Sequence, residues 1–371
     1  MEHTKWNRGG QIVNYDKLPQ ELESQIPIQN ENDDLPDKVG DFNKLRDILS
    51  RSNTRDAYCR SVLYFVFTGR GIVWTVKHGD NYLLLLPHPN IIGSLLVFFP
   101  FATDASELVE QVKALCNCKS FLKEFQEVLL ARIPESIAEE ALKKAARLHN
   151  SLCCKLEIVN ETKLDWGYPS YDVQLQKLIN PQGGKLKTYR KKIRKFCDLS
   201  IEVIRPKDLD QQELRKAVIQ INKNWIRAKS RGGSSLQGRG ISLRELIGPY
   251  QTLARLNSDI TLAIDGLILK RGGAYVAFSF WERPSSGDIV SCFAALPCSY
   301  EKGLSEYLYY CIANCLKSEG YNSMCIGGSE TASLDQFKQK LSPTDTHRLH
   351  TIKLSPQNQD SNPLSLTEFR Y

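Results

Sequence analysis

The segment from residue 321 to residue 341 reads YNSMCIGGSETASLDQFKQKL and contains a strand, a glycine turn and a helix in succession. Tyr321–Ile326 is an apolar run of strand length, and Gly327-Gly328 closes it. Two glycines at this place let backbone N–H groups approach a ligand closely. Ser333–Leu341 has helical spacing, and its first residue begins a capping box. The segment therefore predicts a strand-to-helix turn that can receive a ligand.

The helices and strands that we predict in the second half, around this segment, follow the order of those that we predict in the first half. In the second half we predict strands at Asp259–Ile264, Gly273–Trp281 and Asp288–Ala295, then a helix at Lys302–Ser318. In the first half we predict strands at Ser61–Phe67, Gly71–Lys77, Tyr82–Leu86 and Ser94–Phe99, a helix at Asp104–Cys116, a strand at Glu127–Ile133 and a helix at Pro134–His149. This shared order predicts an α+β fold with mixed β-sheets in two domains, residues 1–155 and 156–371.

The composition is that of a globular protein without a membrane span. The 371 residues leave room for two domains, with 42% hydrophobic and 25% charged residues. The longest apolar stretch, residues 91–102, is interrupted by Pro100 and is shorter than the roughly 20 residues that a span needs. Residues 1–10 lack the apolar core of a secretory signal. We expect a cytoplasmic protein.

Eleven cysteines are present, but no Cys-x-x-Cys pair occurs. The close groupings are Cys116-x-Cys118, Cys153-Cys154 and Cys311-x-x-x-Cys315. Structural zinc sites show two paired clusters, so we expect small buried side chains here and no metal site. His347 and His350 lie in a polar region near the end of the chain, where exposed loop residues are expected.

Positive charge is concentrated in two windows. Lys185–Lys195 contains seven basic residues and Leu214–Arg244 contains eight, and neither window holds an acidic residue. Since the net charge of the chain is +7, the remainder carries +7 − 15 = −8. Such segregation predicts a localised positive potential suited to a polyanion such as RNA. The alternative for the first window is a solvated surface helix.

The first window also has helical periodicity, with an apolar stripe at Leu186, Tyr189, Ile193 and Phe196. The second contains a glycine-rich cationic segment, Arg231–Gly240, which is either a phosphate-binding loop or a plain linker. The candidate residues for tRNA or phosphate binding are Lys185, Tyr189, Arg190, Lys191, Lys192, Arg194, Lys195, Arg231 and Arg239.

Three segments together resemble a known family. They are Leu164–Asp172 leading to Gly183–Phe196, then Asn224-Trp225, and then the run from Gly327 to Lys340 followed by Pro343. The resemblance is to the C-terminal catalytic domain of lysyl-phosphatidylglycerol synthases and its soluble relatives, over residues 160–345. That domain is related to the Fem-type aminoacyltransferases, within the GNAT acyltransferase superfamily.

The resemblance implies tandem GNAT-like domains and transfer of an acyl group, often aminoacyl from charged tRNA, to an amine or hydroxyl. It implies tRNA as partner and aminoacyl-tRNA as co-substrate with no further cofactor, and it leaves the acceptor open. The multi-span membrane portion of the lipid-modifying enzymes is not in this sequence, which disfavours a phospholipid acceptor, although peripheral membrane contact stays open. The first half lacks the glycine and Phe-Lys motifs, so we expect it to be a structural partner and the junction of the halves to receive the acceptor.

Two alternatives to tRNA-dependent transfer are considered, and the first is a different acyl donor. GNAT enzymes that use acetyl-CoA grip its pyrophosphate with a glycine-rich turn before a helix. Here that junction, residues 297–305, keeps one glycine and places Glu301 where phosphates would lie. An acyl-CoA-dependent N-acyltransferase is therefore the second reading, and a non-catalytic RNA-binding protein on the same fold is the third.

Aminoacyl transfer needs a donor for the developing oxyanion and an acceptor for a proton. The resemblance places Lys338 beside the reacting ester, while the alternative is an exposed helix lysine. Glu330 is the first candidate for proton acceptor, with Asp335, Asp172 and Glu282 as other options. Tyr300 is a candidate proton donor to the leaving group. The candidate substrate-binding residues are Gly327, Gly328, Ser329, Phe337 and Asp172.

Overall fold

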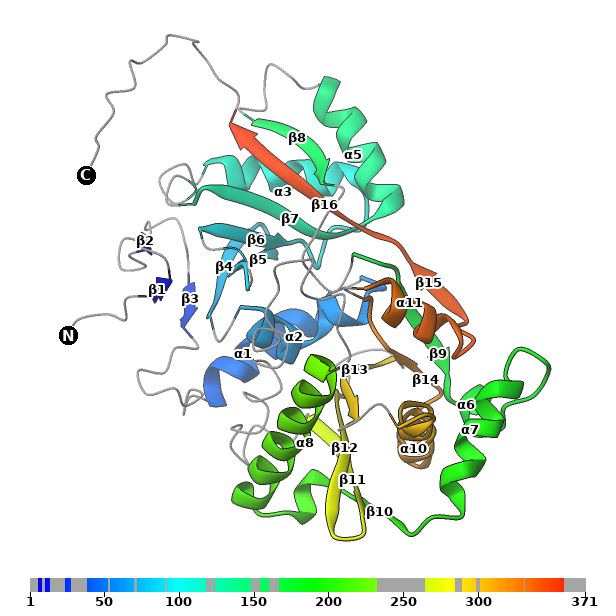
Figure 1. Cartoon of the computed structure of the whole chain (residues 1–371). Coiled ribbons are helices and arrows are strands. Elements are labelled where there is room, and N and C mark those ends of the chain that lie inside the picture. The colour runs from blue at the N-terminus through cyan, green and yellow to red at the C-terminus, as the bar shows by residue number, and fades with distance from the viewer. Residues whose placement is uncertain are drawn as a thin grey trace.

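The computed structural model describes most of the chain between residues 39 and 356, together with three short strands before it (Figure 1). The described residues are 6–8, 11–13, 24–27, 39–52, 54–69, 72–89, 91, 93–117, 122, 125–147, 154–159, 167–231, 264–283, 289–297, 301–329 and 331–356. They form two seven-stranded mixed sheets with helices packed on them, and a separate ribbon of β1 (Trp6–Arg8) and β2 (Gln11–Val13).

The first sheet has the strand order β3-β4-β5-β6-β7-β16-β8. Its strands are β3 (Ser24–Pro27), β4 (Ile72–His78), β5 (Asn81–Pro87), β6 (Ser94–Phe98), β7 (Glu127–Pro134), β8 (Cys154–Val159) and β16 (Leu349–Pro356). Helices α3 (Ala105–Asn117) and α5 (Glu135–Arg147) bury their apolar residues in one core cluster with the strands of this sheet.

The second sheet has the order β10-β11-β12-β13-β14-β9-β15. Its strands are β9 (Ser170–Gln174), β10 (Ile201–Ile204), β11 (Ile264–Arg271), β12 (Ala274–Glu282), β13 (Ile289–Pro297), β14 (Ser323–Cys325) and β15 (Asp345–His347). The helices of this half are α6 (Leu175–Ile179), α7 (Lys187–Cys197), α8 (Gln211–Arg231), α10 (Leu304–Ser318) and α11 (Ala332–Gln339), with a short 3-10 helix, η3 (Pro206–Asp208).

Both sheets repeat one pattern of strand directions. Read along each order, the neighbours are antiparallel three times, then parallel once, then antiparallel twice. The parallel pairs, β6–β7 and β13–β14, hold the same place in the two sheets, and each is connected through a helix. The α+β fold with two mixed sheets is therefore confirmed, and the predicted duplication is visible in the topology.

The end of the chain links the two sheets. β15 pairs with β9 in the second sheet, and after Arg348 the chain continues as β16, which lies between β7 and β8 in the first sheet. Figure 1 shows this crossing as an orange-to-red ribbon that runs from one sheet to the other. Sheet membership thus differs from the predicted division at residues 155 and 156, because β8 extends to Val159 and β16 belongs to the first sheet.

The segment predicted as a strand at Ser61–Phe67 is helical, so that prediction is wrong. It forms the 3-10 helix η2 (Ala57–Arg60) and helix α2 (Val62–Thr68). Its residues Val62–Phe65 are buried in a core cluster that also takes side chains from α1 (Val39–Ser50), α8 and β12, so these apolar side chains are buried without a strand. The capping residue of α11 also differs from the prediction. The side chain of Thr331, and not that of Ser333, accepts a hydrogen bond from Leu334 N at the start of this helix.

The start of α2 is held by a carboxylate from the other half of the chain. Glu282, at the end of β12, is buried and accepts hydrogen bonds from Ser61 Oγ (2.6 Å), Val62 N (3.2 Å) and Leu63 N (3.0 Å). Burial raises the pKa of Glu282, against the lowering effect of these three donors. The carboxylate satisfies N–H groups that a helix start leaves unpaired, and so ties η2 and α2 to the second sheet.

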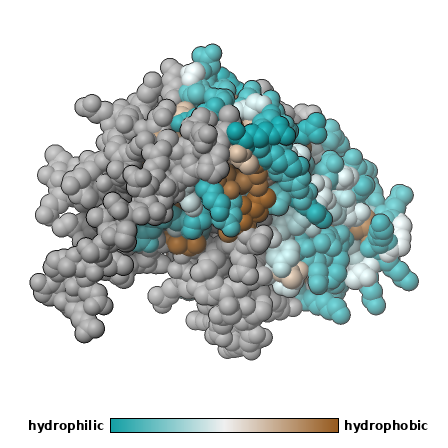
Figure 2. All heavy atoms as spheres, turned by 90° about the horizontal axis from the view of Figure 1, so that it is seen from above, coloured by the Kyte–Doolittle hydropathy of each residue, from teal (hydrophilic) through white to brown (hydrophobic). Residues whose placement is uncertain are grey.

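A core cluster shared by the two halves fills the space between the sheets. Besides α1, η2 and α2 it contains residues of the first sheet such as Phe98, and residues of the second half such as Ile221, Phe278 and Cys325. Figure 2 looks down on the molecule from the side of the first sheet, where hydrophilic residues cover most of the described surface and a group of apolar residues lies near the centre. No helix among the described residues has the length and hydrophobicity needed to cross a membrane.

We predict that Glu282→Ala lowers the melting temperature by roughly 2–10 °C, because three buried donors lose their acceptor at a cost of roughly 1–3 kcal/mol. A thermal melt followed by circular dichroism measures the change. Glu139→Ala, at an exposed position of α5, is the matched control and should leave the melting temperature within about 1 °C. Equal melting temperatures for the two variants would contradict the prediction.

Candidate active site

The parallel pair of the second sheet is short. β13 pairs with β14 only over Ile289–Ser291, then continues to Pro297 while β14 ends at Cys325. The chain that leaves β14 continues through Ile326 into the Gly327-Gly328-Ser329 turn. The predicted ligand-binding turn therefore lies where this pairing ends, and we call the place between Cys292 and Gly327 the opening of the second sheet.

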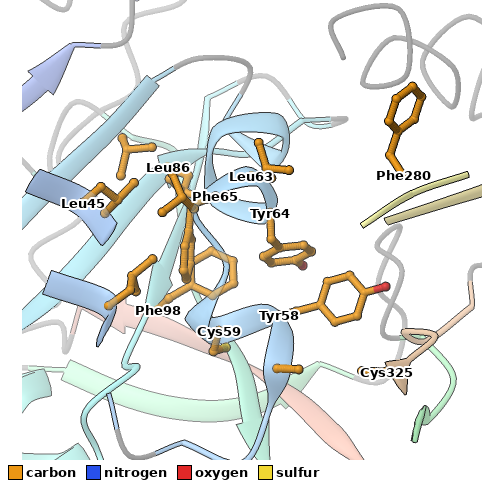
Figure 3. Packing of buried hydrophobic residues seen from close by; sticks show 14 of the residues in the cluster. Leu45, Tyr58, Cys59, Leu63, Tyr64, Phe65, Leu86, Phe98, Phe280 and Cys325 are labelled. Atoms are coloured by element: carbon orange, nitrogen blue, oxygen red, sulfur yellow. The ribbon is translucent and has the colours of Figure 1, made fainter. Parts of the chain in front are cut away.

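Tyr58, from η2 of the first half, closes the base of this opening. Its hydroxyl donates to the carbonyl of Cys292, the first β13 residue beyond the pairing. Gly327, at φ +66°, lies against the same side chain: a β-carbon there would be 2.7 Å from the Tyr58 hydroxyl oxygen. Figure 3 shows the Tyr58 hydroxyl pointing away from Tyr64, toward the side of the second sheet where Cys325 lies.

Lys338 approaches the turn from α11. Its side chain is buried, and its ammonium donates to the carbonyl of Gly328. Phe337, its neighbour, is half-buried with its ring 5.7 Å from that of Tyr309. The alternative that Lys338 is an exposed helix lysine is therefore wrong. A buried ammonium at the carbonyl of a glycine turn is a preorganised positive charge.

Ser329 ends the turn with a buried hydroxyl. Its side chain is fully buried, and its Oγ has no hydrogen-bond partner among the described residues. Asp335, one turn before Lys338 on α11, is by contrast already committed: it accepts from the Tyr171 hydroxyl (2.8 Å) and from Gln339 Nε2 (2.7 Å). Burial and the bond to Asp335 raise the pKa of Tyr171. Of these two residues, Ser329 is the one left to contact a substrate.

On the opposite face of the sheet, Asp172 and His347 form a pair. Asp172, in β9, is buried, and its Oδ2 lies 2.7 Å from Nε2 of His347 in β15. The hydrogen bond to Asp172 raises the pKa of His347 against the effect of burial. His347 is thus a half-buried strand residue, not the exposed loop residue that the sequence predicts. Nothing local signals the pair, since 175 residues separate its members.

A second buried ion pair lies next to this face, in the first half. Arg132 of β7 has a positive φ of 55° and donates to both oxygens of Asp56, at 2.5 and 2.8 Å. Its guanidinium lies over the rings of Tyr58 and Tyr64, 5.1 and 4.9 Å from their centroids. Although burial opposes it, Arg132 holds the pKa of Asp56 below its usual value. Because Asp56 also caps η2, the pair fixes Tyr58 in place.

The basic window of residues 185–195 forms α7 with its predicted stripe buried. Tyr189 belongs to this stripe and lies in the core, so including it among the tRNA-contacting residues is wrong. Three of the cations have partners in the chain: Arg190 bonds the carbonyls of Pro181 and Gly183, Lys192 pairs with Glu306, and Lys195 lies 3.6 Å from Glu301. The other three candidates of this window are exposed and form no ion pair within the described residues: Lys185, Lys191 and Arg194.

The junction before α10 is occupied by a paired carboxylate. Glu301 accepts from Arg271 Nη1 (3.2 Å) and Nη2 (2.8 Å), and this bond lowers its pKa. Gly303 follows with its α-carbon packed against Phe196 and Lys192 of α7. The place that would receive a CoA pyrophosphate therefore holds an internal anion.

Several predicted residues fall outside the described part of the chain: Tyr300, Glu330 and Arg239. Arg231 is the last residue of α8, and its side chain is likewise not described. Within the described residues, no three His, Cys, Asp or Glu side chains are grouped as metal ligands. Glu282, one of the alternative proton acceptors, is excluded from that role by its three bonds to the start of α2.

No protein-family model and no curated protein sequence matches this chain. Solved structures do match, at low sequence identity. The match to FemX covers 84% of this chain and 95% of FemX, with a TM-score of 0.54 and 12% identity. The L-PGS of Bacillus licheniformis covers 85% and 91%, with a TM-score of 0.53 and 14% identity. The chain shares the fold of these two proteins.

A conserved protein of unknown function from Bacteroides thetaiotaomicron shares this fold over 86% of this chain and 97% of its own, with a TM-score of 0.59 and 14% identity. These likenesses confirm the predicted resemblance to the lysyl-phosphatidylglycerol synthases and Fem-type proteins at the level of the fold. In this chain the second half holds the short parallel pair, the glycine turn and Lys338.

We predict that Gly327→Ala destabilises the protein more than Gly79→Ala does. Both glycines have φ near +60°, which costs an L-residue roughly 1–2 kcal/mol, but the space around Gly79 is empty and that at Gly327 holds Tyr58. Thermal melts of the two variants measure the difference. Adding Tyr58→Phe should recover part of the stability of Gly327→Ala, because it removes the closest atom. Equal destabilisation by the two glycine variants would contradict the assigned packing of Tyr58 on Gly327.

Proposed function

We propose that this protein transfers an aminoacyl group from aminoacyl-tRNA to an amine or hydroxyl acceptor. The observation that carries the proposal is the buried ammonium of Lys338 at the carbonyl of Gly328, where β13 and β14 diverge. The fold shared with FemX and L-PGS supports an acyl or aminoacyl transferase. The resemblance of the turn and its Phe-Lys pair to the aminoacyltransferases supports the finer assignment.

In the proposed reaction the acceptor nitrogen or oxygen attacks the ester carbonyl carbon, and the carbonyl oxygen becomes an oxyanion. Lys338 stabilises this charge, and its bond to Gly328 fixes where the ammonium lies. Ser329, whose buried hydroxyl has no hydrogen-bond partner among the described residues, is our candidate for a second donor to the same oxygen. The bond from carbon to the ribose oxygen then breaks, and the ribose oxygen takes up a proton. No acyl-enzyme is needed.

The choice of tRNA over acyl-CoA rests on Glu301. A pyrophosphate before α10 would meet a carboxylate that already binds Arg271 and lies near Lys195, so two cations of this junction are neutralised internally. The negative charges of a pyrophosphate and of the Glu301 carboxylate would repel each other, and the repulsion is stronger where solvent is partly excluded. The exposed cations of α7, by contrast, are available to a large polyanion.

We predict that Lys338→Ala lowers kcat about a hundred- to a thousand-fold while the Kd for charged tRNA changes only a few-fold, because the charge that Lys338 meets exists mainly in the transition state. Single-turnover transfer from a bulk tRNA pool charged with labelled amino acids, to Nα-acetyl-lysine amide or glycerol as probe acceptors, measures kcat, and filter binding measures Kd. Lys338→Arg should not restore the rate, since a guanidinium places its donors differently.

Lys340→Ala is the matched control for this experiment, because Lys340 is an exposed lysine at the end of the same helix. It should keep the wild-type rate. Wild-type protein that binds charged and uncharged tRNA equally and transfers no aminoacyl group would contradict the proposal and favour the non-catalytic alternative. Transfer from labelled acetyl-CoA but not from charged tRNA would favour the acyl-CoA alternative.

We predict that Lys191→Glu with Arg194→Glu weakens tRNA binding and lowers its salt dependence, by about one unit of log–log slope for each tRNA phosphate that the protein no longer binds. Filter binding over a range of salt concentrations gives the slope. Lys155→Glu with Lys143→Glu, at exposed positions of β8 and α5 in the first half, changes the net charge by the same amount and is the control. An unchanged slope in the α7 variant would leave α7 a solvated surface helix.

A further inference from the structure

The register of the second sheet places His347 in the same row as Gly327. Cys325 lies opposite Asp172, and Ser329 lies opposite Tyr168, so Gly327 lies opposite Ser170. On the other side of β9, Ser170 lies opposite His347. Two strand spacings, about 10 Å, therefore separate the backbones at Gly327 and His347.

The Asp172–His347 pair lies on the face that Tyr58 covers, and Lys338 lies on the other. Side chains alternate along a strand, so Tyr171, which bonds Asp335 of α11, points away from Asp172 and Ser170. Cys325, opposite Asp172, packs in the core cluster that contains Tyr58. The pair thus lies on β9 and β15, next to β14, on the face of the sheet opposite to the ammonium that we assign to the oxyanion.

The hydrogen bond fixes the tautomer of His347. An ionised carboxylate can only accept, so Nε2 carries the proton that it donates to Asp172, and in the neutral ring Nδ1 is left as an acceptor. The side chain of His347 is 25% exposed and that of Asp172 is 6% exposed. An imidazole that is held at one nitrogen by a buried carboxylate and keeps a quarter of its side chain exposed is the arrangement of a general base.

The charged groups around His347 come from four elements. They are Asp172 of β9, Asp345 of β15 itself, Asp56 at the start of η2, and the thiol of Cys325 in β14. Asp56 is paired with Arg132, and burial raises the pKa of the Cys325 thiol well above its usual value, so that thiol stays neutral. The carboxylates raise the pKa of the ring and so make it a stronger base.

Resting on the proposed function, we infer that His347, held by Asp172, is the general base that removes the proton from the acceptor amine. An alkylamine is an ammonium ion at neutral pH and has no lone pair for attack until it loses a proton. Nδ1 of His347 takes that proton, directly or through one water, and the neutral amine attacks the ester carbonyl to give the oxyanion. The nitrogen then passes its second proton to the ribose oxygen as the C–O bond breaks, and the imidazolium releases the first proton to solvent, which restores the starting state.

The test compares two probe acceptors in the full-length protein, with charged tRNA as donor. Nα-acetyl-lysine amide must lose a proton before it attacks, whereas hydroxylamine is already neutral at pH 7. His347→Gln should lower kcat/KM for the lysine probe about a hundred- to ten-thousand-fold and for hydroxylamine far less. Asp172→Asn should act in the same direction. His350→Gln, in β16, is the matched control and should change neither rate.

The pH profile gives a second measurement. The base works only when neutral, so kcat/KM for the lysine probe should rise with pH through the pKa of His347, which lies above the ordinary value of about 6.5. His347→Gln should abolish this rise of kcat/KM with pH, which we call the pH limb. Proton NMR of the wild type, with the ring assigned from the variant, should show the raised pKa and its fall in Asp172→Asn.

The outcomes separate this inference from the function on which it rests. Transfer by the wild type with an equal decrease in rate for both probes in His347→Gln, or with an unchanged pH limb, would overturn the inference and leave the proposed function standing. An NMR pKa of His347 that does not fall in Asp172→Asn would also overturn it. A wild type that transfers to neither probe, while binding charged and uncharged tRNA equally, would overturn both.

Discussion

The carboxylate of Glu282 accepts three hydrogen bonds at the start of α2, and the placement of the site follows from that contact. It attaches η2 and α2, which belong to the first half in sequence, to the end of β12 in the second sheet. Asp56, held by Arg132, sets the other end of η2. These two contacts hold η2 so that the Tyr58 hydroxyl donates to the carbonyl of Cys292 and the Tyr58 side chain lies against Gly327. A site in the second half is thus bounded by a residue of the first.

The two sheets share one topology but differ at the end of the parallel pair. In the first sheet the end of β7 carries Arg132, whose buried guanidinium is enclosed by Asp56 and two tyrosine rings. In the second sheet the pairing stops at Ser291, and glycines follow β14. The corresponding place is thus filled by an ion pair in the first half, whereas in the second half it is formed by a glycine turn. This difference is consistent with a structural role for the first half.

Sequence patterns were informative where neighbours along the chain decide the structure. The stripe Leu186, Tyr189, Ile193 and Phe196 is buried as its spacing predicts, and most strands and helices of both halves were predicted within a few residues of their ends. The patterns failed where distant residues decide. Ser61–Phe67 has strand composition but is helical because Glu282 caps it from 220 residues away. The crossing of β16 and the Asp172–His347 pair have no local signal for the same reason. Tyr189 shows a subtler error: it is included among the tRNA-binding candidates of its basic window, although its place in the apolar stripe predicts that it is buried, as it is.

The arrangement of charge about β14 fits the chemistry of aminoacyl transfer to an amine. The reaction creates negative charge on the donor carbonyl oxygen and removes positive charge from the acceptor nitrogen, so the two reactants need opposite electrostatic environments at almost the same place. A single residue cannot provide both, because an ammonium close to a base lowers the basicity of that base. Here the ammonium of Lys338 comes from the α11 face, while Asp172 and His347 lie on the opposite face. Asp335, the carboxylate nearest to Lys338 along α11, is bonded to Tyr171 and Gln339. The sheet itself lies between the two groups and keeps the two electrostatic environments apart.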